Sequence, residues 1–298
     1  MSARAFDAAA AGSLRLRLDR LRAGLRRVTA DPMGALGLIL VLLIVLTGLF
    51  ADLIAPHDPV AQDLKQRLAG PSWEHWLGTD HLGRDTLSRV IKGTQIALGV
   101  AVSTTFASML IGLVLGLVAG YGPRWLDNSL MLLFDTVYSF PSIMLALAIV
   151  TVIGPSLGTV LLVIVIGTVP AYARLVRTST LAVKEQEFIA AERAMGARAP
   201  RVLFRHILPN VIGPLLIICS MDVPVVVTIE AGLSFLGLGV RAPAPSWGRI
   251  LNEGYSFVRN SPWMVIAAGV PLALTTLGFT FLGEALRDAF DPKLRRRF

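Results

Sequence analysis

Six apolar runs, each long enough to cross a lipid bilayer as a helix, constrain this chain more than any other feature. A hydrocarbon core of ~30 Å takes about 20 apolar residues to span. The runs predict an all-α polytopic membrane protein with six transmembrane helices in one membrane domain. They cover residues 34–53, 96–119, 130–153, 157–175, 211–231 and 263–282; the third and fifth are interrupted by Pro141, Pro214, Asp222 and Pro224.

The charged residues indicate how these helices are oriented. Only 16% of the 298 residues are charged, and the mean hydropathy is +0.66, whereas soluble domains are about 25% charged. If the N-terminus is cytoplasmic, 20 of the 28 Lys and Arg residues fall on the cytoplasmic side. The positive-inside rule then places both termini in the cytoplasm. The net charge of +8 therefore reflects membrane topology and does not indicate a nucleic-acid partner.

The runs and charges together predict the organisation of the chain. The segment 1–33 carries leucines at helical spacing among arginines, which suits a helix lying on anionic membrane lipids; a solvated basic tail is the alternative. The first run is interpreted as an uncleaved membrane helix, not as a signal peptide. The predicted parts are a cytoplasmic basic segment (1–33), a first transmembrane helix (34–53), an extracytoplasmic loop (54–95), a transmembrane core (96–290) with a cytoplasmic loop (180–210), and a basic cytoplasmic tail (291–298).

The sequence offers no constellation for catalysis or for a metal. It contains no Gly-x-x-x-x-Gly-Lys-Ser/Thr loop for phosphates, no Gly-x-Ser-x-Gly and no His-Glu-x-x-His. His75 and His81 share one loop, but no third ligand follows at metal-binding spacing. Cys219 is the only cysteine, which favours a small apolar filler. We therefore expect no enzyme activity, no catalytic residue and no metal site.

Some residues inside the apolar runs predict packing or passage. Gly112, Gly116 and Gly120 fall on one helix face, where small residues let another helix approach closely. That helix could belong to this chain or to a partner subunit. Asp222 and Glu230 lie near membrane depth, where ionisable groups are costly and usually face a wet cavity or the bundle interior. Both are candidates for the translocation path, with a buried hydrogen-bonded role as the alternative for Asp222 and the membrane interface for Glu230.

A dense charged block between the fourth and fifth runs needs its own explanation. The sequence predicts a helix from about Thr180 to Met195, a stop at Gly196, a second basic helical stretch, and Pro209 at the start of the next span. An apolar face presented to water suits docking of a helix in a partner's groove, whereas a loop that only fixes topology is the alternative. This face comprises Phe188, Ala191, Ala194 and Met195.

The block "EFIAAERAMGARAPRVLFRHILPN" resembles the coupling loop of ATP-binding cassette (ABC) importer permeases. Gly196 matches the glycine of that pattern, Leu208 and Pro209 its final pair, and His206 its isoleucine position. The family's Glu-Ala-Ala positions are occupied here by Ala190, Ala191 and Glu192, so the glutamate is displaced by two residues. The stretches "WLGTDHLGRDTLSRVIKGTQIALGVA", "YSFPSIMLALAIV" and "EAGLSFLGLGVRAPAPSWGRIL" extend the resemblance, over nearly the whole chain, to the second permease subunit of dipeptide, oligopeptide and nickel importers.

The resemblance implies a fold, partners and a site. The last five spans would form a methionine-importer-like type I core in a bacterial cytoplasmic (inner) membrane. The partners would be a homologous permease, two cytoplasmic ATPase subunits that use ATP and Mg²⁺, and an extracytoplasmic solute-binding protein; this chain would bind no cofactor. The ATPase-coupling residues would be Glu187, Phe188, Ala190, Ala191, Glu192, Arg193, Met195, Gly196, His206, Leu208 and Pro209.

The solute is less constrained than the mechanism. Short peptides are the expected solute, with nickel complexes or glutathione as alternatives that the same resemblance allows. A secondary transporter driven by an ion gradient is the alternative from a different class, since Asp222 lies close to Pro224 in the fifth run.

The orientation can be tested by labelling. We expect a membrane-impermeant thiol reagent to label a cysteine introduced at Ser72 or Ser246 in intact spheroplasts, because both positions lie in predicted extracytoplasmic loops. It should not label one at Ala199, in the predicted cytoplasmic loop. Labelling at Ala199 in intact spheroplasts would reverse the orientation.

Overall fold

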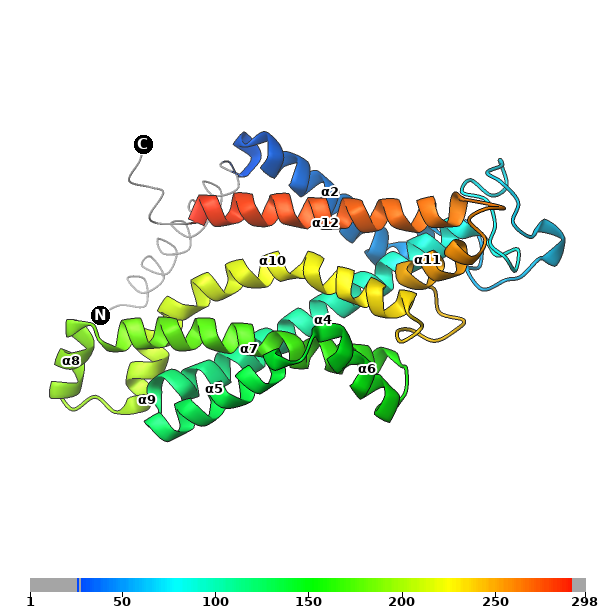
Figure 1. Cartoon of the computed structure of the whole chain (residues 1–298). Coiled ribbons are helices and arrows are strands. Elements are labelled where there is room, and N and C mark those ends of the chain that lie inside the picture. The colour runs from blue at the N-terminus through cyan, green and yellow to red at the C-terminus, as the bar shows by residue number, and fades with distance from the viewer. Residues whose placement is uncertain (1–25, 27, 291–298) are drawn as a thin grey trace, which may run out of the picture.

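The apolar runs fold into long helices that extend side by side along the molecule (Figure 1). The computed structural model describes residue 26 and residues 28–290. Its helices are α2 (Pro32–Leu49), α3 (Ala51–Ile54), η1 (Leu64–Gln66), α4 (Thr86–Tyr121), α5 (Arg124–Ser139), α6 (Ser142–Ile153), α7 (Leu157–Lys184), α8 (Glu187–Ala194), α9 (Ala199–Val202), η2 (Leu203–Ile207), α10 (Leu208–Phe235), α11 (Trp247–Ser256) and α12 (Trp263–Phe290).

The predicted all-helical membrane fold is confirmed, with five or six candidate spans, one of them sharply bent. Within the described residues, five helical stretches are long and apolar enough to cross a membrane, and α5 with α6 makes a sixth if the bent pair is one span. The two halves meet at 91°, next to Pro141. The residue before a proline is pushed out of the helical region, and Phe140 is accordingly extended. Pro214 and Pro224 lie inside α10 without breaking it, as prolines in membrane helices can.

The helices reach further than the apolar runs. α4 begins at Thr86, well before the predicted start at residue 96, and α7 continues to Lys184. Their outer turns are polar, so hydropathy alone places them in loops. The basic tail at 291–298 and most of the predicted surface helix at 14–28 lie outside the described residues.

The α4 and α7 backbones approach each other along the three spaced glycines. A Cβ built on Gly116 would lie 2.5 Å from the carbonyl oxygen of Ala173 and 2.5 Å from the Cβ of Val176. Gly112 and Gly120 meet α7 in the same way. The glycine face therefore packs against a helix of this chain, α7. Of the two alternatives that the sequence left open, a helix of this chain or one of a partner subunit, the structure shows the first.

At the opposite end of the molecule from α8, α11 closes over the start of α4 (Figure 1). The Trp247 side chain is fully buried, and its indole N–H donates a hydrogen bond of 3.0 Å to the carbonyl of Val90. Ser246, which caps α11, is also fully buried. The prediction that a thiol reagent labels a cysteine at Ser246 is therefore wrong, because the fold shields that position from the reagent. Ser72 is exposed and remains suitable for labelling.

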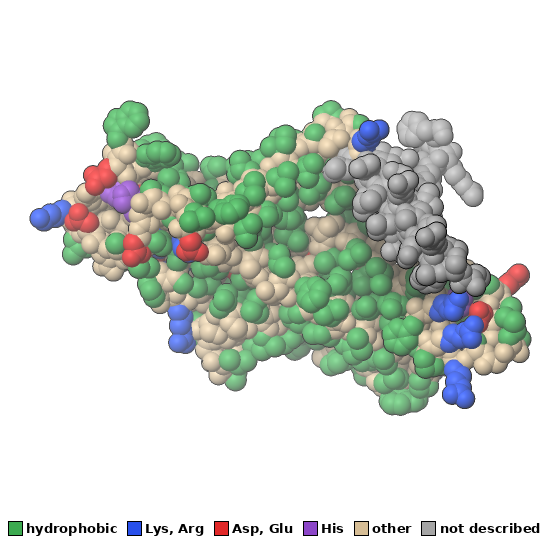
Figure 2. Space-filling view, turned by 180° about the vertical axis from the view of Figure 1, so that it is seen from behind, with side chains coloured by type: hydrophobic (Ala, Val, Ile, Leu, Met, Phe, Trp, Pro, Cys, Tyr) green, Lys and Arg blue, Asp and Glu red, His purple; other side chains and the backbone are tan. Residues whose placement is uncertain are grey.

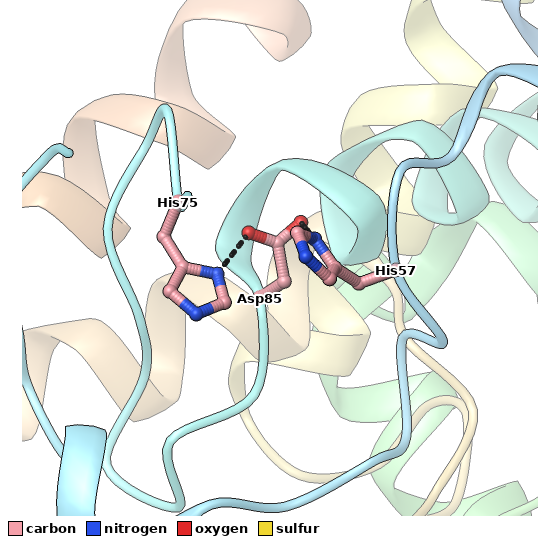
Figure 3. Close-up of side chains that lie close together, drawn as sticks. All are labelled: His57, His75 and Asp85. Carbon is pink, nitrogen blue, oxygen red and sulfur yellow. Dashed lines mark hydrogen bonds and ion pairs between the residues drawn. The ribbon is translucent and has the colours of Figure 1, made fainter. Parts of the chain in front are cut away.

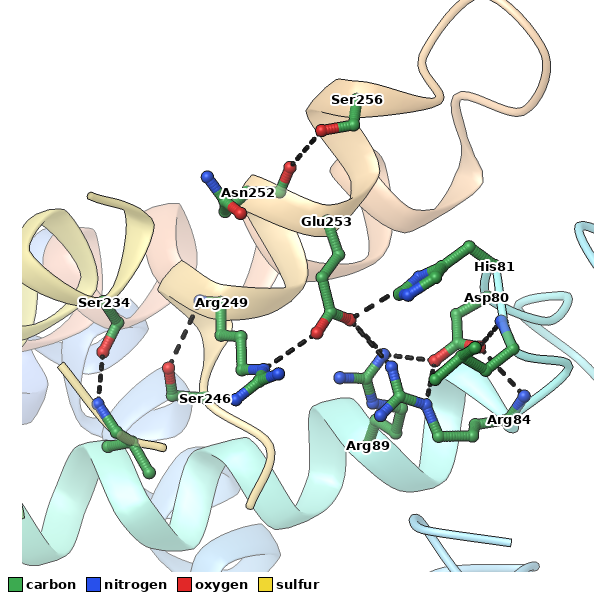
Figure 4. Close-up of polar contacts among 12 residues, drawn as sticks. Asp80, His81, Arg84, Arg89, Ser234, Ser246, Arg249, Asn252, Glu253 and Ser256 are labelled. Carbon is green, nitrogen blue, oxygen red and sulfur yellow. Dashed lines mark hydrogen bonds and ion pairs between the residues drawn. The ribbon is translucent and has the colours of Figure 1, made fainter. Parts of the chain in front are cut away.

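An ion-pair network fixes α11 to the loop that precedes α4 (Figure 4). Glu253 on α11 pairs with Arg84 at 2.9 Å, with Arg89 at 2.8 Å and with Arg249 at 2.8 Å. Asp80 pairs with Arg84 and Arg89 from the other side. Burial by itself would raise the pKa of Glu253, but the arginines outweigh it and hold that pKa below its ordinary value. The carboxylate therefore stays charged and keeps the network intact at neutral pH.

The α4–α7 contact predicts an unequal response to two alanine substitutions in the same helix. Gly116→Ala should destabilise the chain by about 1–3 kcal/mol, because the added methyl group overlaps the α7 backbone. Gly99→Ala should have little effect, because nothing lies within 4 Å of a Cβ there. Unfolding of the purified chain in detergent measures both. Equal stabilities for the two variants would contradict the close packing.

Candidate functional site

The candidate site is the segment 185–207, here called the elbow, which joins α7 to α10 at one end of the molecule (Figure 1). It contains α8, α9 and η2. The prediction of one helix from Thr180 to Met195 is wrong, because α7 ends at Lys184 and α8 begins at Glu187. The chain turns through Gln186, whose backbone is extended. Within the elbow, α8 is therefore a short helix of its own, separated from α7 by a turn.

Ile189 explains why the chain turns there. Its side chain is fully buried in a cluster with Val202, Ile207 and Val211. Burying an isoleucine is worth about 1.5–3 kcal/mol, which exceeds the helix propensity lost at the turn. The sequence interpretation missed Ile189 as an anchor. The sequence does contain a signal for this anchor: Ile189 is apolar but lies next to Phe188, outside the predicted exposed face of the helix.

Gly196 ends α8 as the sequence predicted. Its φ is +84°, in the region that favours glycine. The N–H of Ala197 donates to the carbonyl of Glu192 at 3.0 Å, and the N–H of Gly196 donates to the carbonyl of Arg193 at 2.9 Å. These two bonds form a Schellman cap, which fixes the direction in which the chain leaves α8.

The displaced glutamate, Glu192, joins the first arm of the elbow, which is α8, to its second arm, which is α9 with η2. One carboxylate oxygen of Glu192 lies 3.2 Å from Nε2 of His206 on η2. Its other oxygen lies 3.8 Å from Nε of Arg201 on α9. The Phe188 ring lies against the His206 ring at an interplanar angle of 60°, with 5.8 Å between centroids. Glu192 and His206 are thus placed to hold α8 against α9 and η2.

The last residue of α7 and one residue of α8 both contact the end of α4. Lys184 donates to the carbonyl of Gly120 at 3.3 Å, and its Nζ lies 5.4 Å from the centre of the Tyr121 ring. The guanidinium of Arg193 lies 5.3 Å from the centre of the same ring. Arg193, which the resemblance places among the ATPase-coupling residues, therefore contacts α4. The sequence interpretation did not single out Tyr121 or Lys184.

The second arm passes into α10 through a wider helical turn. Proline has no N–H and crowds the carbonyl one turn earlier. Next to Pro209 the chain forms the π-helical η2, in which the N–H of Leu208 donates to the carbonyl of Leu203. Asn210 adds a side-chain hydrogen bond of 2.7 Å to the carbonyl of His206. The predicted start of the span near Pro209 is therefore a change of helix type within one continuous helical stretch.

One face of α8 is left uncovered in the described structure. Phe188 is 42% exposed and Met195 is 76% exposed, with Ala191 exposed between them; these three residues are here called the docking face. Glu187 and Ala190 are exposed beside it. Lys and Arg side chains gather around this end of the molecule (Figure 2). The predicted apolar face exists, and what it binds stays a prediction.

The two candidate path residues lie on α10, away from the elbow. Asp222 is partly buried. Glu230 is fully buried and accepts a hydrogen bond of 2.6 Å from Ser234. Glu230 is therefore enclosed by its own chain and not exposed at an interface. A role of either residue in the path stays a prediction.

Comparison with known proteins supports the fold. The family model for the binding-protein-dependent transport system inner membrane component matches residues 112–296. The model for the N-terminal transmembrane domain of oligopeptide transport permease C matches residues 20–71. A solved structure of the MetNI methionine ABC transporter in an inward-facing conformation has a TM-score of 0.57 at 19% identity, over 68% of this chain and 97% of that chain. The expected methionine-importer-like fold is confirmed.

Two curated relatives cover almost the whole chain. The dipeptide transport system permease protein of Alkalihalophilus pseudofirmus is 38% identical over 92% of this chain and 90% of the relative. The glutathione transport system permease protein of Pectobacterium atrosepticum is 40% identical over 91% of this chain and 90% of the relative.

The cap of α8 makes a direct prediction about Gly196. Gly196→Val should cost about 1–2 kcal/mol locally, because a β-branched residue disfavours a left-handed backbone, and should loosen the turn that follows. Trypsin should then cut faster after Arg198. Gly196→Asn is the matched control, because asparagine tolerates this conformation, and should resemble the unchanged protein. Equal cleavage of the Val and Asn variants would contradict this role of the cap.

Proposed function

This chain belongs to the family of binding-protein-dependent transport system inner membrane components, and we propose that its elbow couples it to partner ATPase subunits. The chain is a permease subunit of an ABC transporter, with a membrane core of helical spans. The observation that carries the proposal is the docking face, an exposed apolar strip on a helix whose other side is anchored by Ile189.

The docking face suits a groove on another protein. Helix-in-groove recognition uses a few apolar anchors at helical spacing, and Phe188, Ala191 and Met195 follow that spacing. Ala190 and Ala191 keep the helix slim enough to enter a groove. Glu187 adds a charge beside the strip. The family resemblance of this stretch to an ATPase-coupling loop supports the same assignment.

The anchors of the elbow explain how a push on α8 would reach the membrane. Lys184 fastens the end of α7 to the end of α4, and Arg193 fastens α8 to the same place, while Ile189 holds α8 against η2 and the start of α10. A displacement of α8 by closing ATPase subunits would therefore move α10 together with α4 and the α7 helix that is fastened to it. The sequence contains no phosphate-binding loop of its own. ATP and Mg²⁺ would thus be used by the partners, and this chain would bind no cofactor.

The assembly follows from the family and from the charge distribution. We assign this chain one homologous permease as partner, two cytoplasmic ATPase subunits and an extracytoplasmic solute-binding protein. The concentration of Lys and Arg on one side supports a bacterial cytoplasmic membrane location with both termini in the cytoplasm. Membership of a binding-protein-dependent family disfavours the secondary transporter that the sequence left open.

Short peptides are the solute class that the comparisons favour. The relatives are named for dipeptide and for glutathione transport, and both solutes are small peptides with free amino and carboxyl groups. Nickel complexes remain the second choice. In this proposal, Asp222 contributes a carboxylate near the path that could interact with the amino group of a peptide.

Ala191 provides the test of coupling. Ala191→Arg should weaken association with the ATPase subunits by roughly 10-fold or more, because a long charged side chain does not fit a groove that fits alanine. ATP-driven uptake should fall in parallel. Ala199→Arg is the control, since Ala199 is exposed on the elbow outside the docking face. Association is measured by co-purification, and uptake in proteoliposomes with labelled dipeptide.

The outcomes separate coupling from other roles of the elbow. Loss of ATPase association in Ala191→Arg but not in Ala199→Arg supports the docking face. If Ala191→Arg retains full ATP-driven uptake, the elbow serves only to fix topology. Membrane insertion and pairing with the sister permease should be unchanged in both variants, because neither substitution touches a span.

A further inference from the structure

Two histidines and a carboxylate meet in the segment that precedes α4 (Figure 3), at the end of the molecule opposite to the elbow (Figure 1). Nδ1 of His75 lies 2.9 Å from one oxygen of Asp85, and Nδ1 of His57 lies 3.7 Å from the other. One ligand atom from each of the three residues lies within 4.8 Å of the other two. These residues are too far apart in the sequence to form a recognisable metal-binding motif, which is why no third ligand was expected. The fold nevertheless brings three possible ligands together.

The backbone positions all three residues without using the imidazoles. The N–H of His57 donates to Oγ of Ser88 at 3.0 Å, and the N–H of His75 donates to Oγ of Ser72 at 3.0 Å. Asp85 caps α4, with one oxygen accepting from the N–H of Ser88 at 2.7 Å. Each residue comes from a different segment: the stretch after α3, the loop before α4, and the start of α4.

The charges around this group differ from those around a second cluster nearby. Asp80, His81 and Glu253 also bring possible ligand atoms together, but Arg84, Arg89 and Arg249 already neutralise those carboxylates. Among the described residues, the ion pairs of Asp85 are with histidines only. A cation is therefore repelled at the second cluster and attracted at the first.

We propose that His57, His75 and Asp85 bind a divalent transition metal of the Zn²⁺ type. Zn²⁺ takes imidazole nitrogen and carboxylate oxygen at about 2.0–2.2 Å, which places tetrahedral ligand atoms roughly 3.4 Å apart. The separations of 2.9 Å and 3.7 Å, which run to different oxygens of Asp85, lie on either side of that value. Binding would displace the proton between His75 and Asp85. Three protein ligands leave a fourth position for water.

The proposed ion would connect three segments that are far apart in sequence. The His57 side chain is 38% exposed, whereas those of His75 and Asp85 are 10% and 1% exposed. An ion could thus enter past His57 and reach two buried ligands. Once bound, it would clamp the segment that follows the first span and the loop around His75 to the start of α4. The inference is independent of the proposed coupling function.

Zn²⁺ titration of the purified full-length chain tests the site. The protein is purified without a polyhistidine tag, because such a tag would itself bind Zn²⁺. Calorimetry in detergent then measures the stoichiometry and affinity of Zn²⁺ binding. We expect one Zn²⁺ per chain, binding at least 10-fold weaker in His57→Ala, and unchanged binding in His81→Ala. His57→Ala keeps the backbone hydrogen bond to Ser88. His57→Cys should restore binding, because a cysteine thiolate is also a Zn²⁺ ligand.

Three results would overturn the site. One is the absence of stoichiometric Zn²⁺ binding by the unchanged protein. Another is equal binding by His57→Ala, which would mean that the ion binds elsewhere. The third is a loss of binding in His81→Ala as large as that in His57→Ala, which would move the site to the second cluster.

Discussion

The close contact between α4 and α7 is the interaction on which the elbow depends. Gly112, Gly116 and Gly120 leave no room for a side chain between the two helices, so their backbones meet over several turns. In lipid, where apolar surface gains little from burial against another helix, such close packing is a main source of association. α7 therefore enters the elbow from a firmly held position, and Lys184 fastens its end to the last carbonyls of α4.

The elbow itself combines one apolar anchor, one backbone cap and one bridging carboxylate. Ile189 holds α8 inward, Gly196 sets the exit direction, and Glu192 links α8 to η2 through His206. Because the anchors face the protein, the opposite face of α8 is free for a partner. A connector with these attachments can bias a two-state membrane element, whereas a loose loop would absorb the movement.

Physical regularity explains what the sequence could predict. The thickness of the bilayer allows spans to be predicted from the length of apolar runs. The helix stop at Gly196 is predictable because helices often end at a residue with a left-handed backbone, which favours glycine. The turn at Gln186 was not predictable, because it depends on burial of Ile189 against residues of the second arm. The 91° bend beside Pro141 was predictable as a break but not as an angle. His57, His75 and Asp85 meet only through the tertiary fold, which sequence spacing does not show.

The central claim is that the docking face seats in an ATPase subunit, and site-specific photo-cross-linking tests it most directly. A photoreactive amino acid would replace Met195, which is 76% exposed and ends the docking face, in the assembled transporter. The account predicts an adduct whose mass is that of this chain plus one ATPase subunit. Adducts with lipid alone, while the complex stays assembled and active, would contradict it.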